Sequence, residues 1–183
     1  MKRSKIFPKN RKGQFYLIAA IIIIAIIIGF AAVSNYAKKK EVIKLYDLGE
    51  ELGIESENVL DFGTYNEYSE EDMEDLLTEF VQSYSSYATE GKNLYFLFGN
   101  NKEFHFIAYQ ELASDVSIDI GEGINLIQTE PGQKYDFTPE NGKISEVKII
   151  IGDLEYEFDL KPGENFYFII SQEIEGEQYV VKS

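Results

Sequence analysis

The chain has 183 residues, enough for one membrane anchor and one modest domain but not for two well-filled cores, and its net charge is -15. Nine of the 17 basic residues and none of the 32 acidic ones lie in residues 1–40, so the rest of the chain is strongly acidic. An acidic body repels phosphate groups, which argues against nucleic acid as a partner. The chain has no cysteine, so a hydrophobic core and not disulfides must stabilise its folded part.

Residues 14–37 form a stretch of 24 residues without a charged side chain. As a helix this stretch is roughly 36 Å long, enough to cross a hydrocarbon core of about 30 Å. Tyr16 near one end and Tyr36 near the other are expected at the two membrane interfaces. Basic residues are concentrated before the span, which places the N-terminus in the cytoplasm and the C-terminal part outside. We therefore predict a single-pass protein of the cell membrane, with the lipid membrane as one partner.

Two other interpretations of this stretch stay open. A helix that is apolar on every side is also found in the core of a large soluble protein. A secretory signal cleaved after Ala31 or Val33 is the second alternative, although such signals use apolar stretches of roughly 7 to 15 residues. The length and uniformity of the stretch favour the membrane anchor over both.

The residues at the start of the stretch form a distinctive junction, Arg11-Lys12-Gly13-Gln14-Phe15. A basic pair, a glycine and a glutamine that opens a long apolar helix resemble the class III signal peptide of archaeal type IV pilin-like proteins. The resemblance covers about residues 11–37. It implies that a prepilin-type peptidase in the membrane cuts between Gly13 and Gln14 on the cytoplasmic side and leaves the helix on the mature chain. It also implies self-assembly, or assembly with other pilin-like subunits, into a surface filament.

One position departs from this family. Many pilins have a glutamate at the fifth position of the mature helix, where it offsets the terminal amine of a neighbouring subunit. Here that position is Ile18. Two hypotheses therefore remain: a pilin-like subunit or minor component of a type IV pilus-like filament, and a solitary membrane-anchored binding module of unknown ligand.

Beyond the span, apolar residues recur at helical spacing up to Gly53, where the helix is predicted to end. They are Val42, Ile43, Tyr46, Leu48 and Leu52. The segment from Ile54 to Ser69 has no clear period and is predicted to be irregular. The predicted organisation is a basic cytoplasmic leader (1–13), a transmembrane helix (14–37), a helix extension (38–53) and an extracytoplasmic domain (54–183).

A second, amphipathic helix is predicted from Glu70 to about Glu90. Ser69 is placed as its N-cap and Asp72 as the acidic residue of a capping box, and Gly91 can end it. Apolar residues recur at spacings of three and four along this segment. They are Met73, Leu76, Leu77, Phe80, Val81, Tyr84 and Tyr87.

After Gly91 the period of the apolar residues changes to two, which predicts β-strands. Short turns between them favour antiparallel pairing in one sheet. The segment from Phe166 to Ile170 is apolar on both faces and is predicted to be central, with a helix behind it. The fold class is therefore α+β, a pilin-like arrangement of a long N-terminal helix and a sheet domain. The expected strands are Leu94–Phe98, Phe104–Tyr109, Val116–Ile120, Ile124–Thr129, Ile144–Ile151, Leu154–Leu160, Phe166–Ile174 and Gln178–Lys182.

Motifs for catalysis or cofactor binding are not found in the sequence. His105, the only histidine, has no cysteine or second histidine to form a transition-metal site, so a structural role is expected. Asp61-Phe62-Gly63 matches a kinase motif by letters alone, without the glycine-rich and catalytic loops that give the motif meaning. We predict no enzyme, no catalytic residues, no cofactor and no metal site.

Three acidic residues near a glycine turn, Asp115, Asp119 and Glu122, carry oxygen ligands that suit Ca²⁺. Their spacing is not that of an EF-hand loop. A solvated acidic edge of the sheet is the favoured interpretation, with calcium as the alternative.

Overall fold

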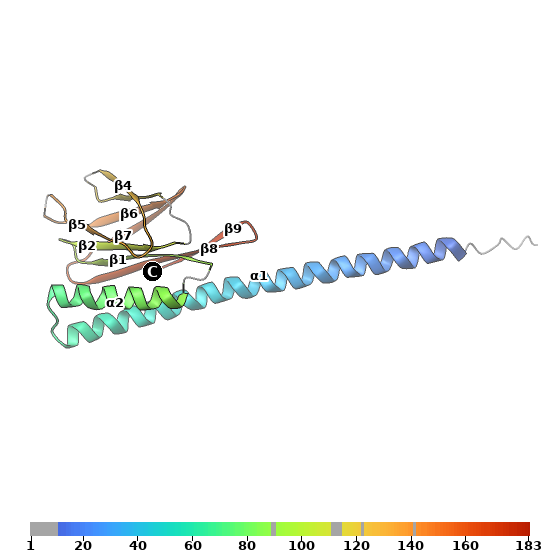
Figure 1. The fold of residues 1–183 in the computed structure, drawn as a ribbon, viewed down its shortest axis with the longest axis horizontal. Helices are drawn as coiled ribbons and strands as arrows, with labels where there is room; N and C mark the ends of the chain where they lie inside the picture. Colours follow the sequence, from blue (N-terminus) through green and yellow to red (C-terminus); the bar gives the residue numbers. More distant parts are fainter. Residues whose placement is uncertain (1–10, 89–90, 111–114, 122, 141) are drawn as a thin grey trace, which may run out of the picture. The chain divides into compact units, whose positions relative to one another are not determined.

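The computed structural model describes residues 11–88, 91–110, 115–121, 123–140 and 142–183, and the side chains of residues 11–15 lie outside this description (Figure 1). The described residues divide into two compact units, one that ends at Glu41 and one that begins at Val42. The described elements are two helices and nine strands. They are α1 (Arg11–Tyr65), α2 (Glu70–Ala88), β1 (Asn93–Gly99), β2 (Phe104–Tyr109), β3 (Asp115–Asp119), β4 (Ile124–Gln128), β5 (Lys134–Phe137), β6 (Glu146–Ile151), β7 (Leu154–Asp159), β8 (Asn165–Ile174) and β9 (Glu177–Lys182).

The part of α1 in the first unit has apolar side chains on every side. Residues 16–36 are exposed almost throughout, and Ile24 and Phe30 expose 56% and 74% of their surface. Among the described residues, α1 is the one helix long and apolar enough to cross a membrane. A helix surface of this kind suits lipid or other apolar surfaces better than water.

The part of α1 in the second unit is longer than the sequence predicts. The helix does not end at Gly53 but continues to Tyr65, so the predicted irregular segment is helical as far as that residue. The positions that face the domain are three, four or seven residues apart, which keeps them on one face of a helix. They are Leu45, Gly49, Leu52, Ser56 and Gly63. Three of these five are glycine or serine, so the hydrophobic pattern alone does not reveal the contact face.

The predicted apolar face of this segment is wrong in part. Ile43 and Tyr46, two of the five residues assigned to it, are about half exposed, whereas Leu45 is fully buried. Gly49 lies so close to β9 that a Cβ atom there would come within 2.4 Å of Val181 Cγ1. Small residues on α1 therefore let its backbone approach the sheet closely.

Helix α2 begins as predicted. The Ser69 hydroxyl accepts a hydrogen bond from the Asp72 backbone N–H at 3.1 Å, and the Ser69 N–H donates to the Asp72 carboxylate at 3.4 Å. This reciprocal pair is a capping box with aspartate in the acidic position. Most of the predicted apolar stripe is buried or half-buried, but Tyr87 is exposed and does not belong to it. Tyr84 donates its O–H to the Leu48 carbonyl at 2.9 Å, which ties α2 to α1.

The strands form two antiparallel sheets and not the single sheet that was predicted. The five-stranded sheet has the order β5-β2-β1-β8-β9, and the four-stranded sheet has the order β4-β3-β6-β7. All eight predicted strands are present with ends within two residues of the prediction. Strand β5 was missed, because its four residues contain only two apolar side chains.

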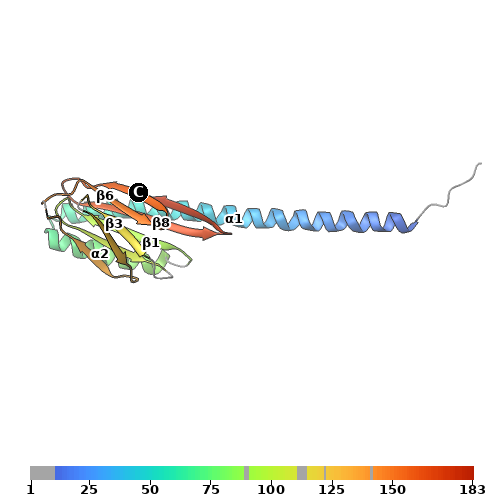
Figure 2. The same ribbon diagram turned by 90° about the horizontal axis from the view of Figure 1, so that it is seen from above.

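The five-stranded sheet is the middle layer of the second unit (Figures 1 and 2). One hydrophobic cluster lies between its first face and helices α1 and α2, and a second lies between its other face and the four-stranded sheet. Residues 42–183 thus form one compact unit with a hydrophobic cluster on each face of its middle sheet. In β8, Phe168 faces the helices and Ile169 faces the other sheet, which confirms the predicted central strand with a helix behind it.

Candidate functional site

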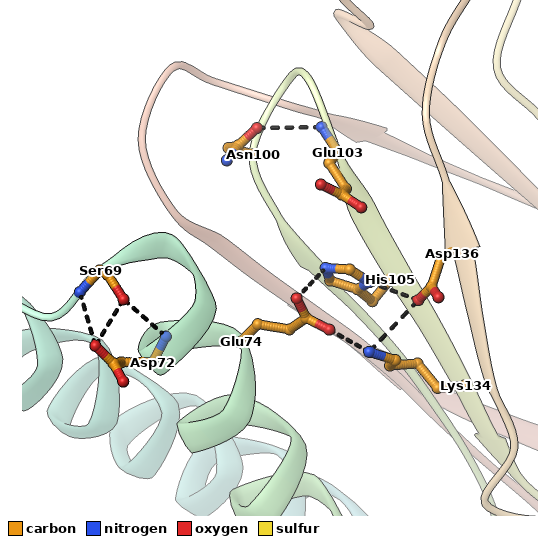
Figure 3. A network of polar contacts seen from close by, with 8 residues as sticks. All are labelled: Ser69, Asp72, Glu74, Asn100, Glu103, His105, Lys134 and Asp136. Atoms are coloured by element: carbon orange, nitrogen blue, oxygen red, sulfur yellow. Dashed lines mark hydrogen bonds and ion pairs between the residues drawn. The ribbon is translucent and has the colours of Figure 1, made fainter.

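Four charged or titratable side chains meet at the helix-facing side of the five-stranded sheet (Figure 3). We call Glu74, His105, Lys134 and Asp136 the His105 cluster. Glu74 comes from the second turn of α2, His105 from β2, and the other two from the edge strand β5. Antiparallel pairing places Asp136 opposite His105 and Lys134 opposite Ile107. Since residues two apart in a strand share a face, the three sheet residues point toward the same helix.

The imidazole of His105 lies between two carboxylates. His105 Nδ1 is 2.8 Å from Asp136 Oδ1, and His105 Nε2 is 3.5 Å from Glu74 Oε2. Because an ionised carboxylate can only accept a hydrogen bond, we assign the proton of the short contact to Nδ1. The ring also packs on Phe98 with centroids 5.4 Å apart, and the residue is only 5% exposed. The orientation of the imidazole is therefore set from both sides.

Lys134 supplies the positive charge of the cluster. Its ammonium group forms an ion pair with Glu74 and lies 3.6 Å from Asp136. Burial alone would lower the pKa of Lys134, but the hydrogen bond to Glu74 and the charge of Asp136 outweigh it and raise this pKa. Burial likewise opposes ionisation of Asp136, yet the hydrogen bond from His105 and the charge of Lys134 lower the pKa of this carboxyl. Both groups are thus held in their charged forms.

A cavity of about 260 Å³ lies beside the cluster, and its wall is rich in carboxylates. It contains Glu74 and His105 together with Glu70 and Glu71 of α2, Glu103 before β2 and Glu164 before β8. Burial raises the pKa of Glu164, and repulsion from Glu70 and Glu74 adds to this rise, although a hydrogen bond from Asn100 opposes it. The cavity is therefore a site of negative potential that favours a cation over an anion or an apolar ligand.

The turn between β1 and β2 forms one wall of the cavity. Gly99 has a φ of 122°, and a Cβ atom there would come within 2.6 Å of the Glu103 carbonyl oxygen, so only glycine fits. The Asn100 side chain accepts hydrogen bonds from two backbone N–H groups of the turn. The buried amide of Asn165 donates to the Gly99 carbonyl at 3.1 Å and joins this turn to the loop before β8. The wall is thus fixed by local hydrogen bonds.

The predicted peptidase junction, Lys12-Gly13-Gln14, lies in the first turn of α1, and its side chains are outside the described residues. Residues 1–10 of the leader are also outside them. The junction therefore stays a prediction. Asp61-Phe62-Gly63 lies at the end of α1, where Gly63 packs against Met73.

Two of the acidic residues considered for calcium, Asp115 and Asp119, lie at the two ends of β3. Asp119 uses its carboxylate to accept a hydrogen bond from the Gly121 N–H at 2.8 Å. Asp115 is exposed at the start of β3, and Glu122 lies outside the described residues. The calcium alternative therefore gains no support from the contacts described here.

Sequence reasoning missed the partners of His105. Glu74 was one of several acids on a helix surface, and the segment with Lys134 and Asp136 was not recognised as a strand. Polar and apolar residues alternate in Lys134-Tyr135-Asp136-Phe137, and this period of two could have identified the strand. Comparison of the chain with known protein families, with characterised proteins and with solved structures found no match.

Proposed function

We propose that the chain is a non-enzymatic cell-surface protein, a pilin-like subunit or minor component of a type IV pilus-like filament. The observation that supports this most strongly is helix α1. Its residues 16–36 are apolar and exposed, while Leu45 and Leu52 of the same helix are fully buried in the core of the second unit. A helix that combines an apolar segment of membrane length with a core segment suits a subunit that passes from a membrane into a filament.

The charge pattern supports the direction of insertion. Six basic residues precede the span, and all 32 acidic residues follow it. Positive-inside bias then keeps the leader in the cytoplasm and places residues 42–183 outside the cell. In this orientation the junction at Gly13 and Gln14 faces the cytoplasm, where a prepilin-type peptidase would cut.

A solitary membrane-anchored binding module is the second candidate function. Ile18 favours it, because the acidic residue that serves filament assembly in many pilins is missing. The acidic cavity beside His105 also favours it, since a module of this kind needs a ligand site in its outer domain. The two candidates differ in processing: a pilin-like subunit is cut between Gly13 and Gln14, whereas a tethered module keeps its leader.

The experiment that separates them is the N-terminal mass of the protein isolated from its native membranes. A mature chain that starts at Gln14 supports the pilin-like proposal. A chain that starts at Met1 or Lys2 contradicts processing and favours the tethered module, and a start after Ala31 or Val33 identifies a secretory signal instead.

A variant pair sharpens this experiment. Gly13→Leu should block cleavage and leave the leader on the chain, because the peptidase of this family cuts after glycine. Gly29→Ala is the matched control, since it changes a glycine of the same helix away from the junction. A normal mature mass for Gly13→Leu would contradict the proposed processing.

A further inference from the structure

The distance between His105 Nε2 and Glu74 Oε2 is unusual for a hydrogen bond. At 3.5 Å it exceeds the usual N–H···O separation of about 2.7–3.2 Å. Two ligands bound tetrahedrally to Zn²⁺ at about 2.0–2.1 Å stand about 3.4 Å apart. The separation is longer than a direct hydrogen bond and lies within ion-pair distance, and it also matches two ligands of one metal ion.

We propose that His105 and Glu74 bind a Zn²⁺ ion at the wall of the acidic cavity, with Asp136 orienting the imidazole. Among the described residues these three side chains each offer a ligand atom, and the three atoms lie within 4.8 Å of one another. They come from α2, β2 and β5, so the fold and not local sequence spacing brings them together.

Asp136 has the role that a second carboxylate has in many zinc sites. With the proton placed on Nδ1, where His105 contacts Asp136, Nε2 is the nitrogen that faces Glu74 and is left to bind a metal. A histidine that binds metal through one nitrogen commonly donates the other N–H to a carboxylate, which fixes the tautomer and raises the basicity of the ligand. The buried imidazole is thus prepared for a metal before the metal arrives.

His105 and Glu74 provide two of the four ligands that Zn²⁺ usually has, and the cavity can provide the others. Its 260 Å³ holds an ion with bound water, and the carboxylates of Glu70, Glu71, Glu103 and Glu164 line it. Carboxylate oxygen and imidazole nitrogen are both established zinc ligands, so a further carboxylate or water completes four-coordination. The same carboxylates attract any divalent cation, but the imidazole selects zinc over calcium and magnesium.

Lys134 competes with the metal. Its ammonium group pairs with Glu74 and so offsets part of the negative charge that a metal ion would otherwise meet. Lys134 is one-third exposed, so its long side chain can move toward solvent when zinc binds. Removing this ammonium should therefore tighten zinc binding, which a cluster that is merely structural would not predict.

The test is a titration of the full chain in detergent with ZnCl₂, followed by isothermal calorimetry. We expect one saturable site, a loss of at least tenfold in affinity for His105→Gln, and a loss of about 10- to 100-fold for Asp136→Asn. Lys134→Met should bind zinc more tightly than the unaltered chain. Lys148→Met is the matched control, because Lys148 also lies among carboxylates, those of Glu146, Glu155 and Glu157, but without a histidine.

Thermal unfolding without zinc shows which variants fold. If His105→Gln is unfolded, the comparison is made with Asp136→Asn instead. The Asp136 side chain is more than half exposed, so its replacement should not unfold the protein. The proposal is overturned if neither the unaltered chain nor Lys134→Met binds zinc saturably, or if binding is the same in Asp136→Asn and Lys148→Met. Zinc binding and the N-terminal mass are separate measurements, so failure of the zinc site is distinguishable from failure of the proposed processing at Gly13.

Discussion

Residues 16–36 and residues 42–65 belong to one helix but differ in which side chains they expose. The first segment exposes Ile, Leu, Ala and Phe on every side. The second exposes mostly charged and polar residues and buries a narrow stripe that includes Leu45, Gly49 and Leu52. Hydrophobicity alone therefore identifies the first segment. The second segment is recognised by its close packing on the sheet, where a buried glycine marks the contact face as well as a buried leucine does.

The largest expected effect is on insertion of the first segment into a membrane. The double variant Ile23→Lys/Ile27→Lys should make insertion less favourable by about 5 kcal/mol or more, since each lysine near the centre of a span costs about 2.5–3.5 kcal/mol. Retention in membranes after alkaline extraction measures this change.

The control for this variant is Tyr46→Lys/Glu50→Lys, which places two lysines at the same spacing on exposed positions of the second segment. This control should keep the retention of the unaltered protein. Equal loss of retention in both variants would contradict the division of α1 into two segments.

Leu52→Ala should affect the second unit and not the membrane. Leu52 is fully buried, and truncation of a buried leucine costs about 2–5 kcal/mol of unfolding free energy. Chemical unfolding in detergent, followed by circular dichroism, measures the loss. Ile24→Ala should leave the unfolding midpoint of the second unit unchanged, and a matching drop in both variants would show that the two segments share one environment.

Two glycines of the second segment should respond in opposite directions. Gly49→Ala should lower the unfolding free energy by about 1–3 kcal/mol, because the new methyl group collides with Val181. Gly53→Ala should raise it by about 0.5–1 kcal/mol, because a Cβ atom there meets nothing within 4 Å and alanine is the better helix former. Stabilisation by both substitutions would show that α1 does not approach β9 closely.

The smallest effect concerns the contact between α1 and α2. Tyr84→Phe removes the hydrogen bond to the Leu48 carbonyl and should cost about 0.5–1.5 kcal/mol. Burial, together with the charges of Glu51 and Glu55, raises the pKa of Tyr84 above its ordinary value. Above a pH of about 10 the unfolded tyrosine ionises while the folded one does not, so the unaltered protein loses stability as pH rises.

The difference between Tyr84→Phe and the unaltered chain should therefore shrink, and then reverse, in alkaline solution. Unfolding midpoints measured at neutral pH and above pH 10 test this expectation. A constant difference across that range would mean that Tyr84 ionises equally in both states.

The sequence predicts best those elements in which large apolar residues carry the contact. The strands and α2 are of this kind, and the capping box at Ser69 and Asp72 was also predicted correctly. The end of α1 was missed because Gly49, Ser56 and Gly63 occupy its contact face, and a hydrophobic period does not register them. The second sheet was missed because alternation predicts the faces of a strand but not which strands it pairs with.

The His105 cluster could not be predicted from the sequence for a related reason. Its members stand at positions 74, 105, 134 and 136, in three segments far apart in the sequence, and each is an ordinary polar residue in its own segment. Only the pairing of β5 with β2, and the packing of α2 on the same face, brings them together. A histidine that is alone in the sequence is therefore not alone in the fold.

The central claim is that residues 14–37 lie in a membrane with the following domain outside the cell. The chain has no cysteine, so a single introduced thiol reports its own surroundings. Tyr65→Cys, at a position that is 88% exposed, should react with a membrane-impermeant thiol reagent on intact cells. Ile24→Cys should stay unlabelled before and after lysis, although its side chain is exposed in the protein itself. Labelling of Ile24→Cys as fast as Tyr65→Cys, or labelling of Tyr65→Cys only after lysis, would contradict the account.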